Sequence, residues 1–140
     1  MRARHIAGLF AQPGRFDLDS IREEADLSEY LPVEQQRAYD VRPLVRAVLD
    51  KPDPESDAAP DPAGGFAELQ PKWAPNVVVG LGRLAGRTVG VIANNPLRLG
   101  GCLDSTAAEK ASRFVRMCDS FGVPLLVLVD VPGYLPGVGQ

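Results

Sequence analysis

Cysteine and histidine are scarce in this sequence, and their scarcity argues against several kinds of site. The 140 residues include two cysteines, Cys102 and Cys118, and one histidine, His5. Two cysteines cannot form a disulfide framework, and these two lack the spacing of metal ligands. One histidine argues against a histidine-based triad and against a multi-histidine metal site. We therefore expect no bound metal and a reducing, cytoplasmic setting.

Excess basic charge and long apolar runs are also missing. The formal net charge is −3 at pH 7, whereas nucleic-acid-binding domains normally carry a strongly basic face. No apolar run reaches the roughly 18 residues of a membrane-spanning helix, and the apolar stretch of the basic N-terminus is too short for a secretory signal. We expect neither a nucleic-acid nor a membrane partner. The composition, 45% hydrophobic and 24% charged, suffices for one ordinary globular core.

Residues 1–34 favour a pair of surface helices without chemistry. A helix is predicted over residues 2–12, where the apolar side chains share one face: Ile6, Leu9 and Phe10. A Pro-Gly pair then ends it. Residues 16–30 are acidic and only weakly periodic, and three positions are expected to face inward: Ile21, Ala25 and Tyr30.

A second helix and a mobile loop are predicted before the strands begin. The run YDVRPLVRAVLD, residues 39–50, has Asp40 as a capping residue and a proline that a first turn tolerates. Residues 51–65 are rich in proline and acidic side chains. Such a segment cannot bury enough apolar surface to offset the entropy of ordering, so we expect a mobile surface loop.

Two strands and a tight turn follow. Residues 76–84 and 87–95 are rich in β-branched side chains and are joined by Ala85-Gly86, which predicts a β-hairpin. Their apolar runs occupy both faces, which indicates strands covered on both sides.

The most regular helical period lies in residues 105–121. Thr106 and Glu109 have capping-box spacing, with Asp104 or Ser105 as alternative caps. An inward stripe is predicted at Ala107, Ala111, Phe114, Val115 and Cys118, and an outward face at Glu109, Lys110, Arg113 and Arg116. Gly122 marks the end of the helix.

The run from Val123 to Val131 is predicted to be a central, buried strand. A strand, a helix and a strand in this order form a right-handed crossover with parallel outer strands. The strand should therefore pair in parallel with residues 87–95, and the fold class is α/β.

Two glycine loops are the candidates for chemistry. The first, Asn94 to Gly101, joins a strand to a helix, and its backbone N–H groups suit an anion or a polarised carbonyl. It lacks the spacing of dinucleotide and P-loop motifs, and a tight structural connection is the alternative. The second, Val131 to Gly137, follows the predicted buried strand, and Gly133 can leave its N–H facing a ligand, as donors for oxyanions do. A plain surface turn is the alternative there.

Four individual side chains are weaker candidates for chemistry than the two loops. Cys118 lies on the apolar helix stripe and is expected in the core. Cys102 adjoins a helix N-terminus, which lowers a thiol pKa, but no base is near in sequence and a packed side chain is expected. Asp130 ends a strand, where a structural hydrogen bond is expected. Arg98 could meet a phosphate or a carboxylate, with a solvated loop arginine as the alternative.

Several long strings resemble one enzyme family. They are YDVRPLVRAVLD, FAELQPKWAPNVVVGLGRLAGRTVGVIANNP and LGGCLDSTAAEKASRFVRMCDSFGVPLLVLVDVPGYLPG. They resemble the carboxyltransferase β subunit of biotin-dependent acyl-CoA carboxylases, most of all the actinobacterial acetyl-/propionyl-CoA type. The resemblance covers nearly the whole chain and is weakest at residues 51–65.

The resemblance implies a fold and an activity. The family's subunits have two crotonase-like domains, assemble as hexamers, and act with biotin carboxylase and a biotin carrier subunit. They transfer a carboxyl group from carboxybiotin to the α-carbon of acetyl-CoA or propionyl-CoA. Residues 1–34 would be the closing helices of the N-terminal domain. Residues 35–140 would be the first half of the C-terminal, biotin-facing domain, a partial crotonase-like ββα fold.

The resemblance also implies site residues. The backbone N–H groups of Gly133 and Tyr134 would be oxyanion donors, because the reaction develops negative charge on the enolate and on the biotin ureido group. The biotin-side cavity would be lined by Asn94, Asn95, Pro96, Gly100, Gly101 and Pro132. Biotin that has lost its carboxyl group would take the proton, so no protein base is required.

Parts of the family's pattern are missing from the sequence, namely the acyl-CoA loops and the second glycine-rich element of the biotin side. The sequence therefore resembles an internal fragment or a truncated gene product. We expect it to be inactive alone and poorly stable, with the strand at Val127–Val131 and its helix partly uncovered. Two alternatives stay open: a non-catalytic remnant acting only in subunit association, and another crotonase-superfamily enzyme of acyl-CoA thioesters, such as a decarboxylase.

Overall fold

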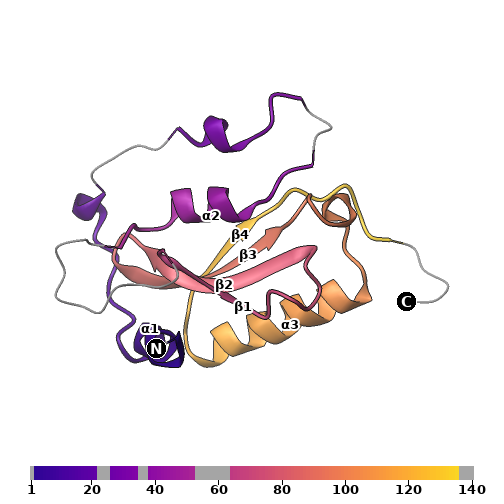
Figure 1. The fold of residues 1–140 in the computed structure, drawn as a ribbon. Helices are drawn as coiled ribbons and strands as arrows, with labels where there is room; N and C mark the ends of the chain where they lie inside the picture. The colour runs from indigo at the N-terminus through magenta and orange to yellow at the C-terminus, as the bar shows by residue number, and fades with distance from the viewer. Residues whose placement is uncertain (1, 22–25, 35–37, 53–63, 136–140) are drawn as a thin grey trace.

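The structure, a computed structural model, describes residues 2–21, 26–34, 38–52 and 64–135. One mixed sheet has the strand order β1 (Phe66–Leu69), β2 (Val77–Leu84), β3 (Arg87–Asn94), β4 (Leu125–Leu128). Helix α2 (Arg42–Val48) lies over one face of the sheet, and helices α1 (Arg2–Ala11) and α3 (Ser105–Ser120) lie over the other (Figure 1). Helices on both faces of a sheet are the layers of an α/β fold, as predicted.

Strands β2 and β3 form the predicted hairpin, in register from Val77 opposite Asn94 to Leu84 opposite Arg87. The two turn residues have positive φ angles, 47° at Ala85 and 79° at Gly86. A two-residue turn of this kind matches the twist of the strands, although an alanine adopts it with difficulty. The Asp50 carboxylate holds the turn, because it accepts the N–H of Ala85 at 2.9 Å and that of Gly86 at 2.8 Å.

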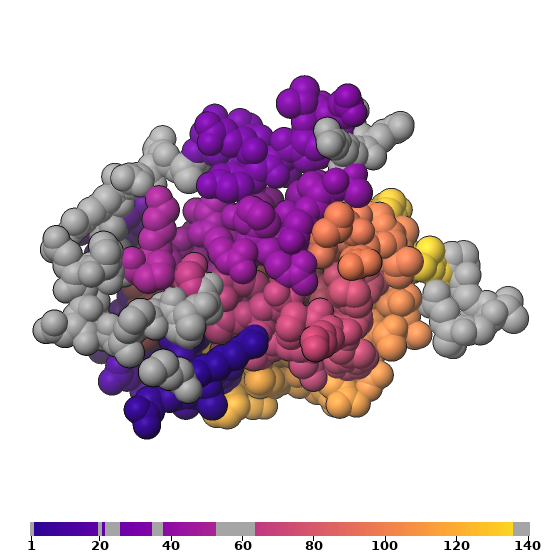
Figure 2. All heavy atoms as spheres, in the orientation of Figure 1, coloured from indigo at the N-terminus to yellow at the C-terminus, as the bar shows by residue number. Residues whose placement is uncertain are grey.

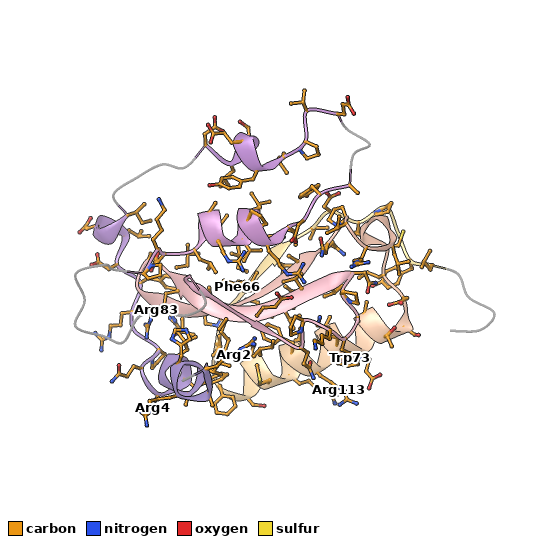
Figure 3. The ribbon with its side chains drawn as sticks, viewed as in Figure 1. Arg2, Arg4, Phe66, Trp73, Arg83 and Arg113 are labelled. Carbon is orange, nitrogen blue, oxygen red and sulfur yellow. The ribbon has the colours of Figure 1, made fainter. Side chains whose placement is uncertain are left out.

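Strand β1 was not predicted. It pairs antiparallel with β2, with Phe66 opposite Gly82. The Phe66 ring is 2% exposed and lies between the sheet and α2 (Figure 3). A Cβ atom at Gly80 would lie 2.5 Å from this ring, so the glycine is needed for the close approach. Because four residues carry too little periodicity, the strand depends on its partner rather than on its own sequence.

The sheet separates two apolar cores. On the α2 side the buried side chains are Val41, Val45, Leu49, Phe66, Val78, Val89, Val91 and Ala93. On the α1 and α3 side the core includes Leu9, Val77, Val79, Leu81, Ala107, Phe114 and Cys118. Strand β2 contributes buried side chains to both cores, and β3 contributes to the α2 side and packs Ile92 against the other core. This confirms that the two strands are covered on both faces.

Helix α3 begins and ends within one residue of its prediction. Of the proposed caps, Asp104 is the N-cap, and its carboxylate accepts the N–H of Ala107 at 2.8 Å. At the other end Gly122 has a φ of 63°, and the Val123 N–H donates to the carbonyl of Cys118 at 2.8 Å. The predicted stop at Gly122 is confirmed.

Two residues of α3 lie on the opposite side from their prediction. Lys110, predicted to face outward, is 1% exposed, and Val115, predicted to face inward, is 39% exposed. A helix turns about 100° per residue, so Lys110 lies about 60° to one side of Ala107 and Val115 about 80° to the other. On the Lys110 side the turn before β2 offers three carbonyls, from Trp73, Ala74 and Val77, to which Nζ donates at 2.7, 3.2 and 2.6 Å.

Strand β4 pairs in parallel with β3, as predicted, but the prediction of a central buried strand is wrong. The strand spans Leu125–Leu128 and lies at an edge of the described sheet. Leu125, Val127 and Val129 are 39%, 51% and 72% exposed. The reason is that α3 packs over β2 and leaves one face of β4 open. The expectation that this strand is partly uncovered is confirmed.

Helix α1 matches its prediction and packs against the sheet. Leu9 is buried in the core, and the Thr88 hydroxyl donates to the Leu9 carbonyl at 2.9 Å. The predicted surface helix pair is wrong beyond α1. The described part of residues 16–30 forms two short 3-10 turns, η1 (Leu18–Ser20) and η2 (Leu27–Tyr30), which are capped by aspartates. Ile21 and Tyr30 are exposed rather than inward, and Ala25 lies outside the described residues.

Helix α2 is shorter than predicted. It begins at Arg42 instead of 39, because the Asp40 carboxylate accepts the Arg42 N–H at 3.1 Å and turns the chain before the helix. Most of the predicted mobile loop at residues 51–65 lies outside the described residues, which resume at 64.

Candidate functional site

The two predicted glycine loops meet at one edge of the sheet. Because β3 and β4 are parallel, their carboxyl ends point the same way, and α/β folds commonly bind ligands at that edge. Residues 95–104, called here the β3–α3 loop, follow β3, and residues 129–135, called here the β4 segment, follow β4. The orange loop and the yellow segment lie side by side at the right of the molecule (Figures 1 and 2).

Backbone hydrogen bonds join these two segments. The Leu103 N–H donates to the Gly133 carbonyl at 3.1 Å, and the Leu135 N–H donates to the Leu103 carbonyl at 2.8 Å. At Gly101, which has a φ of +81°, a Cβ atom would lie 2.7 Å from the Asp130 carbonyl oxygen. A side chain at this position would therefore push the segments apart, and glycine allows them to touch.

Gly133 and Tyr134 carry the backbone groups that were predicted as oxyanion donors. Gly133 is half-buried with a φ of +155°, and Tyr134 is 73% exposed. Pairing with Leu103 uses the Gly133 carbonyl and the Leu135 N–H. Within the described part of the chain, neither the Gly133 nor the Tyr134 N–H donates a hydrogen bond.

Asn94 bridges the two segments from the end of β3. Its side-chain amide donates to the Gly101 carbonyl at 3.2 Å, and its oxygen accepts the Asp130 N–H at 3.3 Å. The residue is 8% exposed. A primary amide carries both donors and an acceptor, so one side chain can hold both loops. Asn94 was predicted to line the cavity, and its polar atoms are engaged inside the fold.

Two further buried asparagines hold the β3–α3 loop against the rest of the domain. The Asn95 amide donates to the Pro75 carbonyl at 3.2 Å, and its oxygen accepts the Val41 N–H at 3.4 Å. The Asn76 amide donates to the Cys102 carbonyl at 2.9 Å. Asn76 was missed, because an asparagine before a strand is an ordinary turn residue by sequence. Only its burial, at 2% exposure, marks it out.

A tyrosine outside both loops fixes the β4 segment. The Tyr39 hydroxyl donates to the Asp130 carboxylate at 2.7 Å. Burial, together with this hydrogen bond and the charge of Asp130, raises the pKa of Tyr39 to about 12. The expected structural hydrogen bond of Asp130 is confirmed. Tyr39 was not singled out as a site residue, since its partner lies 91 positions away in the chain.

A shallow pocket of about 480 Å³ lies beside the β3–α3 loop. Its polar lining includes Asn76, Arg98 and Asp104, and its apolar lining includes Leu97 and Leu99. Hydrogen bonds, above all from the Ala107 N–H, lower the pKa of Asp104, so this carboxylate is ionised at the N-terminus of α3. Arg98 is exposed at the surface of this pocket, which leaves both of its predicted roles open.

Some of the remaining residues predicted to line the cavity are exposed, and others are buried. Gly100 and Pro132 are exposed, whereas Asn95, Pro96 and Gly101 are buried. The Gly101 N–H is engaged in a turn with the Arg98 carbonyl at 2.9 Å. Of the residues predicted for the site, Gly100, Pro132 and Tyr134 lie at the exposed surface of this edge, and the buried residues lie beneath it.

Cys118 lies in the core, as predicted, and Cys102 is half-buried. Both are free, and Cys118 is fully buried, which raises the pKa of its thiol to about 11 and keeps it protonated. In the described ranges there is no group of three or more side chains suited to a metal ion. Among the helices of those same ranges, none is long and apolar enough to cross a bilayer.

A sheet with helices on both faces and two loops that meet at the carboxyl ends of its parallel strands defines a class of protein, the α/β proteins. Comparison with known families gives the particular family. The model of the carboxyl transferase domain matches residues 7–140, and the chain belongs to this family.

Comparison with individual relatives supports the same family assignment. The chain is 58% identical to the biotin-dependent acetyl-/propionyl-coenzyme A carboxylase beta6 subunit of Mycobacterium tuberculosis, over 99% of this chain and 27% of that protein. It is 54% identical to the propionyl-CoA carboxylase beta chain of Rhodococcus erythropolis, over 28% of that protein. The transcarboxylase 12S structure matches 99% of this chain and 26% of its own, with a TM-score of 0.80 and 33% identity. The chain therefore spans little more than a quarter of the curated relatives named here.

Proposed function

We propose that this chain forms part of the carboxybiotin-facing wall of an acyl-CoA carboxyltransferase acting on acetyl-CoA or propionyl-CoA. The observation that carries the proposal is the pair of N–H groups at Gly133 and Tyr134, which make no hydrogen bond within the described part of the chain. Family membership supports the reaction class. The relatives, which include acetyl-/propionyl- and propionyl-CoA carboxylases, support the substrates.

The chemistry of the proposed reaction explains why backbone donors suffice. Bound carboxybiotin would supply the carboxyl group: its bond from carbon to the biotin nitrogen would break as the bond to the acyl α-carbon forms, and the α-proton would pass to the biotin nitrogen. Negative charge develops on oxygen atoms during this exchange, and fixed N–H groups stabilise such charge without reorganisation. Gly133 and Tyr134 would supply these donors, and no side chain of this chain needs to act as base or nucleophile.

The residues at this edge fit a bound biotin head group. Carboxybiotin supplies the activated carboxyl group when bound. Its ureido oxygen is a hydrogen-bond acceptor, and the available groups of Gly133 and Tyr134 are donors. The exposed surfaces of Gly100 and Pro132 would flank it. The buried residues Asn94, Asn95, Pro96 and Gly101 would act from below, by holding the two segments together.

The proposal extends to partners, domains and location. A beta subunit of a carboxylase works with subunits that carry biotin, so we propose a biotin carboxylase and a biotin carrier as partners. Hexamer assembly is described for transcarboxylase 12S, and we propose it for the protein in which this chain acts. The two free cysteines fit the reducing cytoplasm. The division at residues 34 and 35 between the two carboxyltransferase domains stays a prediction.

A graft tests the proposed function. Residues 1–140 would replace the matching segment of the M. tuberculosis beta6 subunit, and carboxyl transfer from carboxybiotin to propionyl-CoA would be measured. In this graft Tyr134 would be replaced by its α-hydroxy acid analogue, which turns its N–H into an ester oxygen and leaves the side chain in place. We expect kcat to fall about 10²- to 10³-fold, as for the loss of one oxyanion donor.

The same substitution at Tyr30, in the η2 turn, is the matched control and should leave kcat unchanged. An inactive graft with the unmodified sequence would contradict the proposed function. An active graft whose kcat is insensitive to the ester at Tyr134 would contradict the role of that N–H.

A further inference from the structure

We propose that Tyr39 is a positioning residue of the carboxyl-transfer site, which holds the β4 segment through its hydrogen bond to Asp130. The inference rests on the proposed function. Within the described residues Tyr39 forms no hydrogen bond with Gly133 or Tyr134, so its effect would pass through Asp130 and the backbone that follows it. Such a residue affects the position of the Gly133 and Tyr134 N–H groups and takes no part in the hydrogen bonds that they donate.

The contacts form one continuous chain from Tyr39 to the donors. The Tyr39 hydroxyl donates to the Asp130 carboxylate at 2.7 Å. The Asp130 N–H donates to the Asn94 side chain at 3.3 Å, and the Asp130 carbonyl lies against Gly101. Three residues beyond Asp130, the Gly133 carbonyl accepts the Leu103 N–H. Asp130 is therefore the point where the β4 segment is fixed from two sides.

Tyr39 is the contact that comes from outside the two loops. It immediately precedes the turn into α2, on the α2 side of the sheet, and it packs against that core. Val45 and Val41 of this core are 0% and 2% exposed. The Tyr39 ring therefore packs against fully buried side chains, which limit its movement. Asp130 itself is exposed, and it follows an edge strand. A hydrogen bond from a rigid element to an exposed segment limits the motion of that segment.

The first experiment is hydrogen exchange on the 140-residue chain, with Tyr39→Phe, which removes the hydroxyl and keeps the ring. We expect the Leu103 and Leu135 amides to exchange about tenfold faster, because opening of the β4 segment exposes both. The Val45 amide, bonded to the Val41 carbonyl inside α2, should not change. Tyr30→Phe is the matched control and should leave all three amides unchanged.

The second experiment is kinetic and uses the graft described above. Tyr39→Phe should lower kcat about tenfold and leave KM for propionyl-CoA within about twofold, because the donors are misplaced while the acyl-CoA contacts lie elsewhere. Asp130→Ala should do the same, and the double variant should be no worse than either single one. Asp130→Asn keeps an acceptor for the hydroxyl and should restore most of the activity.

The outcomes separate the two proposals. Unchanged exchange of Leu103 and Leu135 in Tyr39→Phe would overturn the positioning role, whatever the kinetics. Additive losses in the double variant would overturn it as well, since the two residues would then act independently. An inactive unmodified graft would contradict the proposed function, while the exchange measurement would still decide whether Tyr39 holds the segment.

Discussion

Replacing Lys110 by methionine tests how a buried cation holds the turn before β2. Lys110 is 1% exposed, and its three donors meet the carbonyls of Trp73, Ala74 and Val77. These carbonyls belong to a turn in which Ala74 has a positive φ of 42°. Methionine has a similar length and fills the same space, but it donates no hydrogen bond. The variant therefore removes the bonds and keeps most of the packing.

The expected loss of stability follows from the carbonyls that are left behind. A buried acceptor without a partner costs about 1–3 kcal/mol, and the Val77 carbonyl is buried at this contact. The Ala74 carbonyl keeps a partner in the variant, because it also accepts the Val77 N–H at 3.1 Å. The Trp73 carbonyl is partly buried and can be reached by water. Methionine also removes the cost of burying an ammonium group, which offsets part of the loss. We expect the free energy of unfolding to fall by about 1–3 kcal/mol.

Urea denaturation, followed by circular dichroism, measures the free energy of unfolding. Tryptophan fluorescence reports on the turn before β2. Trp73 is the only tryptophan of the chain, and its ring lies beside α3, with the Arg113 guanidinium 5.7 Å from the ring centroid (Figure 3). In Lys110→Met we expect its emission to change even where the protein stays folded. Arg116→Met, on the exposed face of the same helix, is the control and should change stability by less than about 0.5 kcal/mol.

A Lys110→Met protein as stable as the wild type would refute this reasoning. It would mean that the three carbonyls find water or other partners, and that the desolvation cost of the ammonium equals the strength of its hydrogen bonds. A loss equal to that of Arg116→Met would lead to the same conclusion.

Two further predictions concern the ends and the packing of α3. Asp104→Ala removes the helix cap on Ala107 and should cost about 1–2 kcal/mol near neutral pH. Because the pKa of Asp104 is lowered from 3.8 in the folded state, this contribution is present above 3.8 and is lost as the pH falls below it. Urea titrations of the two proteins should therefore converge in acid, and a gap independent of pH would contradict the role of the charge. Gly90→Ala would place a Cβ atom 2.6 Å from the Cys118 sulfur and 3.0 Å from Leu125, and it should cost about 1–3 kcal/mol by overpacking. A thermal melting temperature equal to that of the wild type would show that the helix moves away freely.

Local signals in the sequence were sufficient for the elements with the strongest patterns. The β2–β3 hairpin, the limits of α3, its stop at Gly122 and the parallel pairing of β4 all follow from short-range chemistry. A glycine after an apolar helix and β-branched runs around a two-residue turn act through contacts a few residues apart. The family resemblance rests on the same kind of information, because long ordered strings are visible in the sequence itself.

Contacts between distant segments account for what was missed or wrong. Lys110 faces inward only because the turn at 73–77 places its carbonyls beside the helix. β1 exists because β2 supplies its partner, and β4 is exposed because α3 lies over other strands. None of these facts is visible in the residues of the element concerned.

The same division holds for the candidate site. By itself, the sequence determined that two glycine loops end neighbouring parallel strands, because strand order and helix polarity follow from local patterns. Only the tertiary structure decided that these loops touch at Gly101 and Asp130, and that Tyr39, on the α2 side of the sheet, holds Asp130. The physical reason is that a hydrogen bond or a close backbone contact depends on distances of a few ångströms between segments, which chain folding alone sets.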